Sequence, residues 1–198
     1  MKPSVSLVVQ QGGKVAQLQP DADTQLIQYA QNGDAQAFGE LYERYAPRVF
    51  RYLYAHLDNR LDAEDLTEEV FLRVWKSLRS YQEQGVPFLA FLFRVGRNAL
   101  IDHYRRIGKG EAESSIEDLQ LREPGVGPME AVTAILEHQQ LRAKMKELRE
   151  DYRTVLALRF LGELSPEETA RAMGRSAGAV RVLQHRALAA LRSLLERE

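Results

Sequence analysis

With 198 residues, the chain is long enough for one medium domain or two small ones. Hydrophobic residues make up 44% and charged residues 28% of the sequence, which is typical of a soluble folded protein and excludes a wholly disordered or fibrous chain. The formal net charge of -1 argues against a uniformly basic nucleic-acid-binding protein, so any such binding requires locally concentrated charge.

The sequence shows no pattern typical of covalent or metal chemistry. Cysteine is absent, which excludes disulfides, thiolate nucleophiles and cysteine-based zinc sites and fits the reducing cytoplasm, where we expect the protein to act. The four histidines lack metal-ligand spacing, and the sequence has neither a P-loop nor a recognisable nucleophile and base pair. The apolar stretch at residues 5–9 is too short for a signal peptide or a membrane span. We therefore expect no metal, no cofactor and no enzymatic activity.

The first half of the chain is predicted to be helical after a short leader. Residues 1–20 combine glycine and proline without a helical period, so we expect them to form a flexible leader. The spacing of apolar residues then predicts helices over 26–44, 47–57, 62–80 and 87–107. Asp34 is the expected N-cap after a turn at 32–34, and Pro47 is expected to open the second helix. These helices predict a compact domain over 21–107.

The second half begins with a change of composition. Residues 108–128 combine glycine and proline with acidic side chains, which indicates an acidic flexible linker. Helical spacing then returns and predicts helices over 129–150, 151–161, 165–173 and 177–195, within a second domain over 129–198. No segment shows the alternation of a β-strand. The predicted fold class is all-α, with two small helical domains joined by the linker.

The last two predicted helices have the layout of a helix-turn-helix. Ser165, Pro166 and Glu168 have the order of a capping box with proline in the first turn, and Gly174 suits the turn that follows. On the second helix a narrow apolar arc predicts the core face: Val180, Leu183, Ala187, Leu191 and Leu194. The opposite side is basic and carries Arg181, His185 and Arg192, with Val182 beside them and Arg186 on the flank.

This basic side suits a DNA groove. Residues 171–195 contain five arginines and no acid, so the helix can approach phosphates without repelling them. The alternative is a solvated, arginine-rich face on an ordinary helical hairpin.

The helix predicted over 62–80 has an apolar side and an acidic side. Leu66, Val70, Phe71, Val74 and Leu78 are predicted to face the core. Asp65, Glu68, Glu69 and Leu72 project from the other side. The simplest interpretation is that the acids favour the helix dipole. An exposed Leu72 among carboxylates instead suggests a surface for a partner.

The helix predicted over 87–107 has a largely basic side: Arg94, Arg97, Asn98, Ile101, Asp102 and Arg105. Its aromatic residues, and Tyr104 near its end, are at spacings most often found in a core. Basic and aromatic side chains together can also bind single-stranded nucleic acid by stacking on its bases.

Four segments, in this order, resemble the extracytoplasmic-function (ECF) group of bacterial RNA polymerase sigma factors, in the sigma-70 superfamily. The segments are NGDAQAFGELYERYAPRVFRYLY, DAEDLTEEVFLRVWKSLRSY, FLAFLFRVGRNALIDHYRR and LREDYRTVLALRFLGELSPEETARAMGRSAGAVRVLQHRALAALRSLL. The resemblance extends from about residue 23 to the C-terminus. It implies that residues 21–107 are the family's region 2 and residues 129–198 its region 4, and that the linker lies along polymerase channels.

The resemblance also implies binding residues. The acidic helix would dock on the beta-prime clamp helices of core RNA polymerase through Asp65, Glu68, Glu69, Phe71 and Trp75. The helical pattern instead places Phe71 nearer the core and adds the exposed Leu72 to the expected polymerase-binding residues. The basic helix and the loop at 81–86 would bind the minus-10 promoter element, with Tyr81 and Asn98 helping to form a pocket for a flipped-out base. From the basic side of the helix, the expected minus-10 residues also include Arg94, Arg97, Asp102 and Arg105. The minus-35 element would be read by Arg175, Arg181, Val182, His185 and Arg186.

The function expected from this resemblance is that of an ECF sigma factor, which binds core polymerase, recognises both promoter elements and begins DNA melting. The implied partners are core RNA polymerase, through its beta-prime clamp helices and beta flap, promoter DNA and an anti-sigma factor, which is often membrane-bound. Two alternatives remain. A helix-turn-helix repressor or activator would bind DNA alone, usually as a dimer on a palindrome. An interaction adaptor or sigma-like decoy would bind proteins without DNA.

Overall fold

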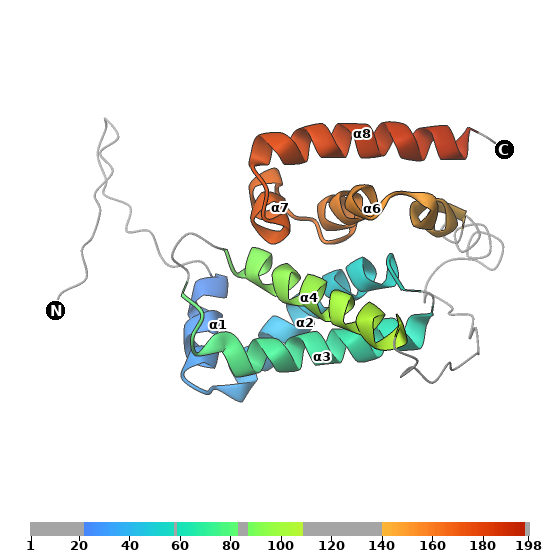
Figure 1. The fold of residues 1–198 in the computed structure, drawn as a ribbon. Helices are drawn as coiled ribbons and strands as arrows, with labels where there is room; N and C mark the ends of the chain where they lie inside the picture. The colour runs from blue at the N-terminus through green and yellow to red at the C-terminus, as the bar shows by residue number, and fades with distance from the viewer. Residues whose placement is uncertain (1–21, 58, 83–86, 109–139, 197–198) are drawn as a thin grey trace, which may run out of the picture. The chain divides into compact units, whose positions relative to one another are not determined.

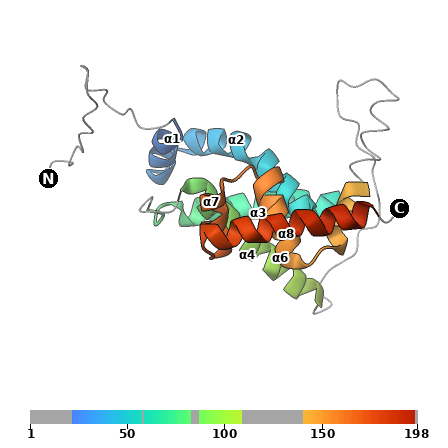
Figure 2. The ribbon, with the colours of Figure 1, turned by 90° about the horizontal axis from the view of Figure 1, so that it is seen from above.

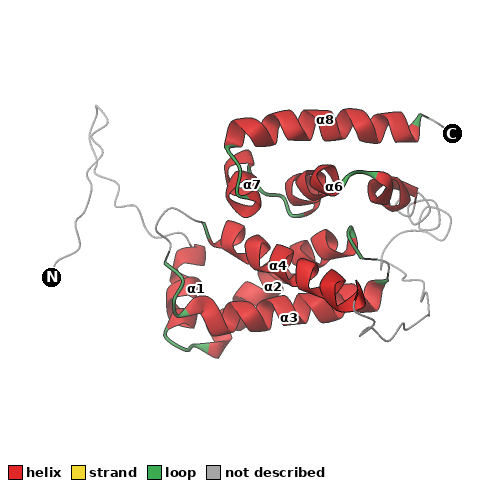
Figure 3. Cartoon of the chain, in the orientation of Figure 1, coloured by secondary structure: helices red, strands yellow, loops and turns green. Residues whose placement is uncertain are grey.

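The structure is a computed structural model that describes residues 22–57, 59–82, 87–108 and 140–196 (Figure 1). Every regular element in these ranges is a helix, as Figure 3 shows, so the predicted all-α class is confirmed. The predicted leader, residues 109–139 and the end of the loop at 81–86 lie outside the described residues. The chain divides between Leu41 and Tyr42 into two compact units, a different division from the predicted boundaries at 107 and 129, which stay predictions.

The first two helices follow the predicted turn. Helix α1, Ala22–Gln31, ends at a turn whose Gly33 has a φ of +94°, and α2 spans Ala35–Tyr54. The Asp34 carboxylate accepts the backbone N–H groups of Gln36 and Ala37 at 2.9 and 3.1 Å. The first N–H groups of a helix have no carbonyl partner within the helix, so these two hydrogen bonds confirm the predicted N-cap.

The prediction that Pro47 opens a new helix is wrong, because Pro47 lies inside α2. A proline removes one backbone donor and clashes with the carbonyl four residues earlier, which normally ends or kinks a helix. Here the apolar face is continuous through the proline: Leu41, Tyr45, Val49 and Leu53 are all buried at four-residue spacing. Burial of this face outweighs the local cost, and Pro47 itself is exposed.

Helices α3, Arg60–Leu78, and α4, Phe88–Gly108, pack side by side (Figures 1 and 2). Helix α3 begins two residues before the predicted start, because the Asn59 side chain accepts the Asp62 N–H at 2.7 Å and acts as the N-cap. The predicted apolar face of α3 is confirmed as buried. The predicted core aromatics Phe88, Phe91 and Phe93 are buried in α4, but Tyr104 is 43% exposed.

The C-terminal helices keep the predicted layout. Residues 140–147 are helical, and α6, Glu150–Leu156, continues into a π-helical turn, η1, Ala157–Leu161, in place of the single predicted α-helix over 151–161. Helix α7, Pro166–Met173, and α8, Ala177–Leu195, follow. Helix α8 contacts both α6 and α7 (Figure 2).

Helix α7 is capped at both ends. Ser165 accepts the Glu168 N–H at 3.1 Å and the Glu168 carboxylate accepts the Ser165 N–H at 2.7 Å, which confirms the capping box. At the other end Gly174 ends α7 with a φ of +65°, a left-handed conformation that a side chain disfavours.

We predict that Gly174→Ala lowers the free energy of unfolding by about 1 kcal/mol, because a left-handed alanine is strained. An added Cβ meets nothing within 4 Å at this position, so the loss reports backbone strain alone. The matched control is Gly178→Ala inside α8, which is equally open and should stabilise by about 0.5–1 kcal/mol. Urea unfolding of both variants checks this. Equal effects of the two substitutions would contradict it.

Candidate functional site

The outer side of α8 is exposed as predicted. Val180 and Ala187 are fully buried on the inner side, while the rest of the predicted core arc, at 183, 191 and 194, is only half-buried. The side chains proposed to read DNA are exposed, and Val182 is 53% accessible. Ser176 caps α8 by accepting the Ala179 N–H at 3.2 Å, which fixes where the helix that carries most of these side chains begins.

Two of these arginines are held by acids from neighbouring helices. Arg181 donates to Glu167 of α7 at 2.6 Å, and Arg175 donates to Asp151 of α6 at 2.7 Å. All four side chains are at least 40% exposed. Exposed pairs of this kind are worth about 0–1 kcal/mol, so either arginine can exchange its acid for a phosphate or a base at small cost. The pairs therefore orient the arginines without blocking them.

The outer side of α3 presents an apolar centre among acids. Leu72 is 59% exposed, with Asp65 and Glu68 exposed on the same helix. Phe71 is buried, and its ring meets the Tyr42 ring edge-on at 4.8 Å. The apolar period had placed Phe71 in the core and Leu72 outside, and both are confirmed. An exposed leucine ringed by carboxylates suits a partner that offers an apolar contact and basic side chains.

Glu69 is not free on this surface, because it joins a cluster between α3 and α4. Arg73 donates to Glu69 through Nε and Nη2, at 3.1 and 2.5 Å, and to Asp102 of α4 through Nη1, at 2.8 Å. Arg106 of α4 donates to the other Glu69 oxygen at 3.1 Å. Arg105 approaches the second Asp102 oxygen at 3.7 Å. The cluster thus connects the proposed polymerase-binding helix to the proposed minus-10 helix.

The cluster keeps its members ionised. Burial opposes ionisation of Glu69, but the hydrogen bonds from Arg73 and Arg106 outweigh it and hold the pKa of that carboxyl below its usual value. The hydrogen bond from Arg73 likewise lowers the pKa of Asp102. The hydrogen bond to Asp102 raises the pKa of Arg73.

Arg73 was missed by sequence reasoning. Its pairing with Glu69 could have been predicted from the sequence, since the two residues are four positions apart on one helix. Its pairing with Asp102, 29 residues away, leaves no pattern in the sequence.

The outer side of α4 exposes Arg94, Asn98 and Arg105, and Arg97 is half-buried. Tyr81 is 8% exposed, and its ring stacks on Phe91 with the centroids 4.8 Å apart. Tyr81 is therefore packed against the core, whereas Arg94, Asn98 and Arg105 of α4 are exposed.

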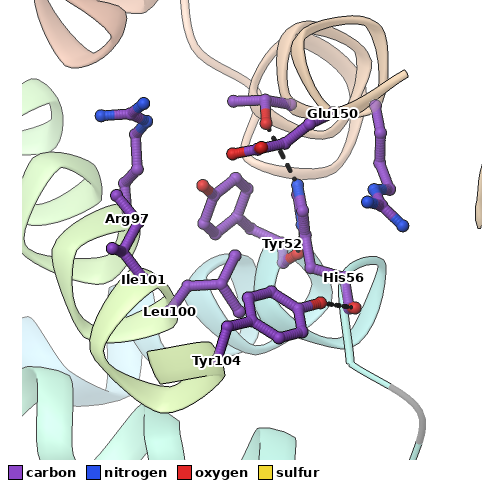
Figure 4. Close-up of a pocket in the computed structure, with 9 residues that line it drawn as sticks. Tyr52, His56, Arg97, Leu100, Ile101, Tyr104 and Glu150 are labelled. Carbon is purple, nitrogen blue, oxygen red and sulfur yellow. Dashed lines mark hydrogen bonds between the residues drawn. The ribbon is translucent and has the colours of Figure 1, made fainter. Parts of the chain in front are cut away.

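A pocket of about 220 Å³ lies between the end of α2, α4 and α6 (Figure 4). Its lining includes Arg97, one of the residues proposed to bind the minus-10 element, and Glu150 of α6. Tyr52 is buried at its base, and burial raises the pKa of that hydroxyl above its usual value. Helices from the first and the second half of the chain thus meet beside a proposed DNA-binding residue.

His56 forms a buried bridge at this pocket. Its Nδ1 lies 2.8 Å from the Tyr52 carbonyl, and its Nε2 lies 3.3 Å from the Thr154 hydroxyl of α6. A carbonyl can only accept, so Nδ1 carries the proton and Nε2 accepts from the hydroxyl. Burial lowers the pKa of His56 to about 4, so the neutral ring is the stable form at pH 7.

Arginine side chains of α2 hold the segment before α7. Arg48 donates to the carbonyls of Gly162 and Glu163, both at 3.1 Å, and Arg51 donates to the Glu163 carboxylate at 3.0 Å. Gly162 sits so close to Phe93 of α4 that an added Cβ would lie 2.8 Å from the ring. These contacts, with the packing of α4 against α7, join the two predicted domains.

Membrane-spanning helices and clusters of metal ligands were sought among the residues that the structure describes, and neither was found there. None of their helices is long and apolar enough to cross a membrane. They also contain no group of three or more potential metal-ligating side chains.

Comparisons with known proteins match both halves of the chain. The family model for Sigma-70 region 2 matches residues 41–110, and that for Sigma-70, region 4 matches residues 138–191. The ECF RNA polymerase sigma factor BldN of Streptomyces coelicolor is 36% identical over 86% of this chain, which spans 65% of BldN, less than two thirds of its length. The ECF RNA polymerase sigma factor ShbA of Streptomyces griseus is 34% identical over 86% of this chain and 94% of its own.

A solved structure extends the likeness to three dimensions. CnrH, in complex with the cytosolic domain of CnrY, superposes with a TM-score of 0.70 at 27% identity, over 90% of this chain and 99% of CnrH.

We predict that His56 makes stability depend on pH. Its folded pKa lies below the ordinary 6.5, so the unfolded chain takes up the proton first. The contribution is complete above pH 6.5 and is lost as the pH falls to about 4, by a total of about 3 kcal/mol. Urea unfolding between pH 4 and 7 should therefore show a shallower pH slope for His56→Gln than for the wild type. The exposed His185→Gln is the control, and an unchanged slope for His56→Gln would refute the assignment.

Proposed function

The chain belongs to the ECF group of sigma-70 family RNA polymerase sigma factors, and from this premise we propose that it acts as a dissociable promoter-specificity subunit of RNA polymerase. It binds core polymerase, recognises a minus-35 and a minus-10 element and starts DNA melting. The observation that carries the proposal is the occurrence, in family order, of region 2 and a capped helix-turn-helix whose exposed side is basic.

For polymerase docking, we propose the outer side of α3. Leu72 supplies the apolar centre, and Asp65, Glu68 and Glu69 supply charge for basic side chains of the beta-prime clamp helices. Trp75 is half-buried at the same helix and extends the surface. Phe71 supports it from the core. Region 4 would contact the beta flap.

For the minus-10 element, we propose α4 and the residues before it. Arg94, Arg97 and Arg105 attract the DNA backbone, and Asn98 offers an amide to the Watson–Crick edge of an unpaired base. Tyr81 would stack on that base after turning away from Phe91. Capture of an extruded base makes strand opening and sequence reading one event.

For the minus-35 element, we propose that α8 enters the major groove. Arg181 and His185 reach base edges, Val182 contacts a thymine methyl group or a sugar, and Arg175 and Arg186 bind phosphates. A bidentate arginine contact to guanine adds about 1–3 kcal/mol of discrimination, whereas phosphate contacts add affinity that falls with salt.

The chain would work by binding alone, in the cytoplasm, without a cofactor, while the polymerase performs the chemistry. CnrH was solved with the cytosolic domain of CnrY, and anti-sigma control of this chain follows as part of the proposal.

A promoter with two separated elements requires the two proposed DNA-binding helices, α4 and α8, to reach sites that are far apart. Elements named minus-35 and minus-10 lie about 25 base pairs apart, or about 85 Å at 3.4 Å per base pair. Helices α4, α7 and α8 have 21, 8 and 19 residues, so even end to end they would reach only about 72 Å. Because α4 contacts α7 in this structure, we propose that this packing is released when both elements are bound.

The test is run-off transcription with core polymerase and the full chain on a pool of promoter fragments, followed by sequencing of the transcript 5′ ends. Specific starts that share two upstream elements are expected. Binding to core polymerase without specific starts would favour the sigma-like decoy and contradict the proposal.

We predict that Arg181→Ala and His185→Ala each reduce specific transcription about tenfold, since each removes a base contact worth about 1–3 kcal/mol. Both should leave core polymerase binding unchanged. Arg192→Ala is the control, because Arg192 is also an exposed arginine of α8 but pairs with Glu196 near the helix end. A loss of similar size for all three variants would indicate a general charge effect instead of base reading.

A further inference from the structure

The pocket between the end of α2, α4 and α6 is large enough for a small molecule (Figure 4). Its volume is about 220 Å³. For comparison, an apolar cavity of about 150 Å³ in a protein can bind benzene. The pocket therefore has room for a molecule that carries one ring or a short chain together with one polar group.

The Tyr52 hydroxyl is a polar group that this pocket leaves without a protein partner. The Tyr52 side chain is 1% exposed, and its hydroxyl forms no hydrogen bond with another residue that the structure describes. Its ring is held edge-on against Phe93, with the centroids 5.4 Å apart, and lies 4.8 Å from the His56 ring. Figure 4 shows the hydroxyl directed into the pocket, between Arg97 and Glu150. Buried hydroxyls are nearly always hydrogen-bonded, so a group inside the pocket is needed to complete this one.

Two arginines give the lining of the pocket a positive charge. Arg97 of α4 and Arg153 of α6 line it, and neither guanidinium forms an ion pair or a hydrogen bond within the described part of the chain. The Nε atom of Arg153 is buried without a partner there. Glu150 is the one acid among the described lining residues, and His56 is neutral because burial lowers its pKa to about 4. Two positive charges against one negative charge favour an anionic ligand.

Arg97 and the Tyr52 hydroxyl act on the same part of the pocket. Burial raises the pKa of that hydroxyl, and the charge of Arg97 has the largest effect in the opposite direction. A carboxylate between the two would accept a hydrogen bond from the hydroxyl and charge-assisted hydrogen bonds from the guanidinium. Leu100 and Ile101 add apolar side chains to the lining. The lining therefore suits a molecule with an anionic head and an apolar body.

We propose that this pocket binds a small monocarboxylate with an apolar body, whose carboxylate lies between Arg97 and the Tyr52 hydroxyl, and that the bound carboxylate competes with promoter DNA. Arg97 is also one of the residues proposed to bind the minus-10 element, so it cannot serve both partners at once. Each partner then weakens binding of the other by the same factor. The competition rests on the proposed function, whereas the binding site rests on the pocket alone. Glu150 disfavours ligands that carry a second negative charge.

The first experiment is an NMR titration of the full chain with benzoate, which combines a carboxylate with one ring. Benzoate should bind saturably and about tenfold more tightly than benzamide, its neutral analogue, and than acetate, which lacks the ring. Tighter binding of benzylammonium would show that Glu150 selects the ligand and would overturn the proposal. An absence of saturable benzoate binding would mean that solvent fills the pocket, and it would overturn the proposal as well.

Substitutions locate the bound carboxylate in the same titration. Tyr52→Phe should weaken benzoate binding about fivefold without lowering the melting temperature, because the hydroxyl has no protein partner to lose. Arg97→Gln should weaken it about tenfold. The matched control is Arg94→Gln, which removes the same charge from an exposed position of α4 outside the pocket. Equal losses in the two arginine variants would indicate a general attraction of anions to α4 and would overturn the site.

The second experiment measures promoter binding by the complex of the full chain with core polymerase, with and without saturating benzoate. Benzoate should weaken promoter binding several-fold, benzamide should not, and the Tyr52→Phe chain should lose most of the benzoate effect. Unchanged promoter binding in saturating benzoate would overturn the competition. If the chain forms no promoter complex with core polymerase, the proposed function fails, and the benzoate titration still decides whether the site exists.

Discussion

The packing of α3 against α4 is the constraint on which the proposed functions of this chain depend. Their buried sides interlock: Val70 of α3 and Leu92 of α4 are both fully buried. This packing turns the acidic side of α3 and the basic side of α4 outward. It also fixes the register in which Arg73 reaches Asp102. One apolar interface thus sets two polar surfaces, one proposed to bind a protein and one proposed to bind DNA.

In the helix-turn-helix, capping residues close together in the sequence fix the position of α8. The capping box at Ser165 and the left-handed Gly174 fix where α7 begins and ends, and Ser176 starts α8. Little core is needed to orient α8, of which only Val180 and Ala187 are buried. The exposed arginines are held by Glu167 and Asp151, so the surface proposed to read DNA is preorganised.

The sequence predicts those features that are caused by residues close together in the chain. The caps at Asp34 and Ser165, the class of the fold and the burial of Phe71 beside an exposed Leu72 were all predicted, because they depend on residues within one or two helical turns. The continuous helix through Pro47 was not predicted, because packing of the whole apolar face of α2 overrides the tendency of proline to end a helix. The partners of Arg73 and the hydrogen bond from Arg48 to Gly162, 114 residues apart, need the fold itself.

The central claim is that two DNA-reading surfaces on one chain act together only on polymerase. The most direct measurement is a DNase footprint on one promoter fragment with the chain alone, with core polymerase alone and with both. The account predicts protection of two upstream elements with both proteins present and no specific protection with either one. Specific protection of a palindromic site by the chain alone would contradict it and would favour a free-standing repressor or activator.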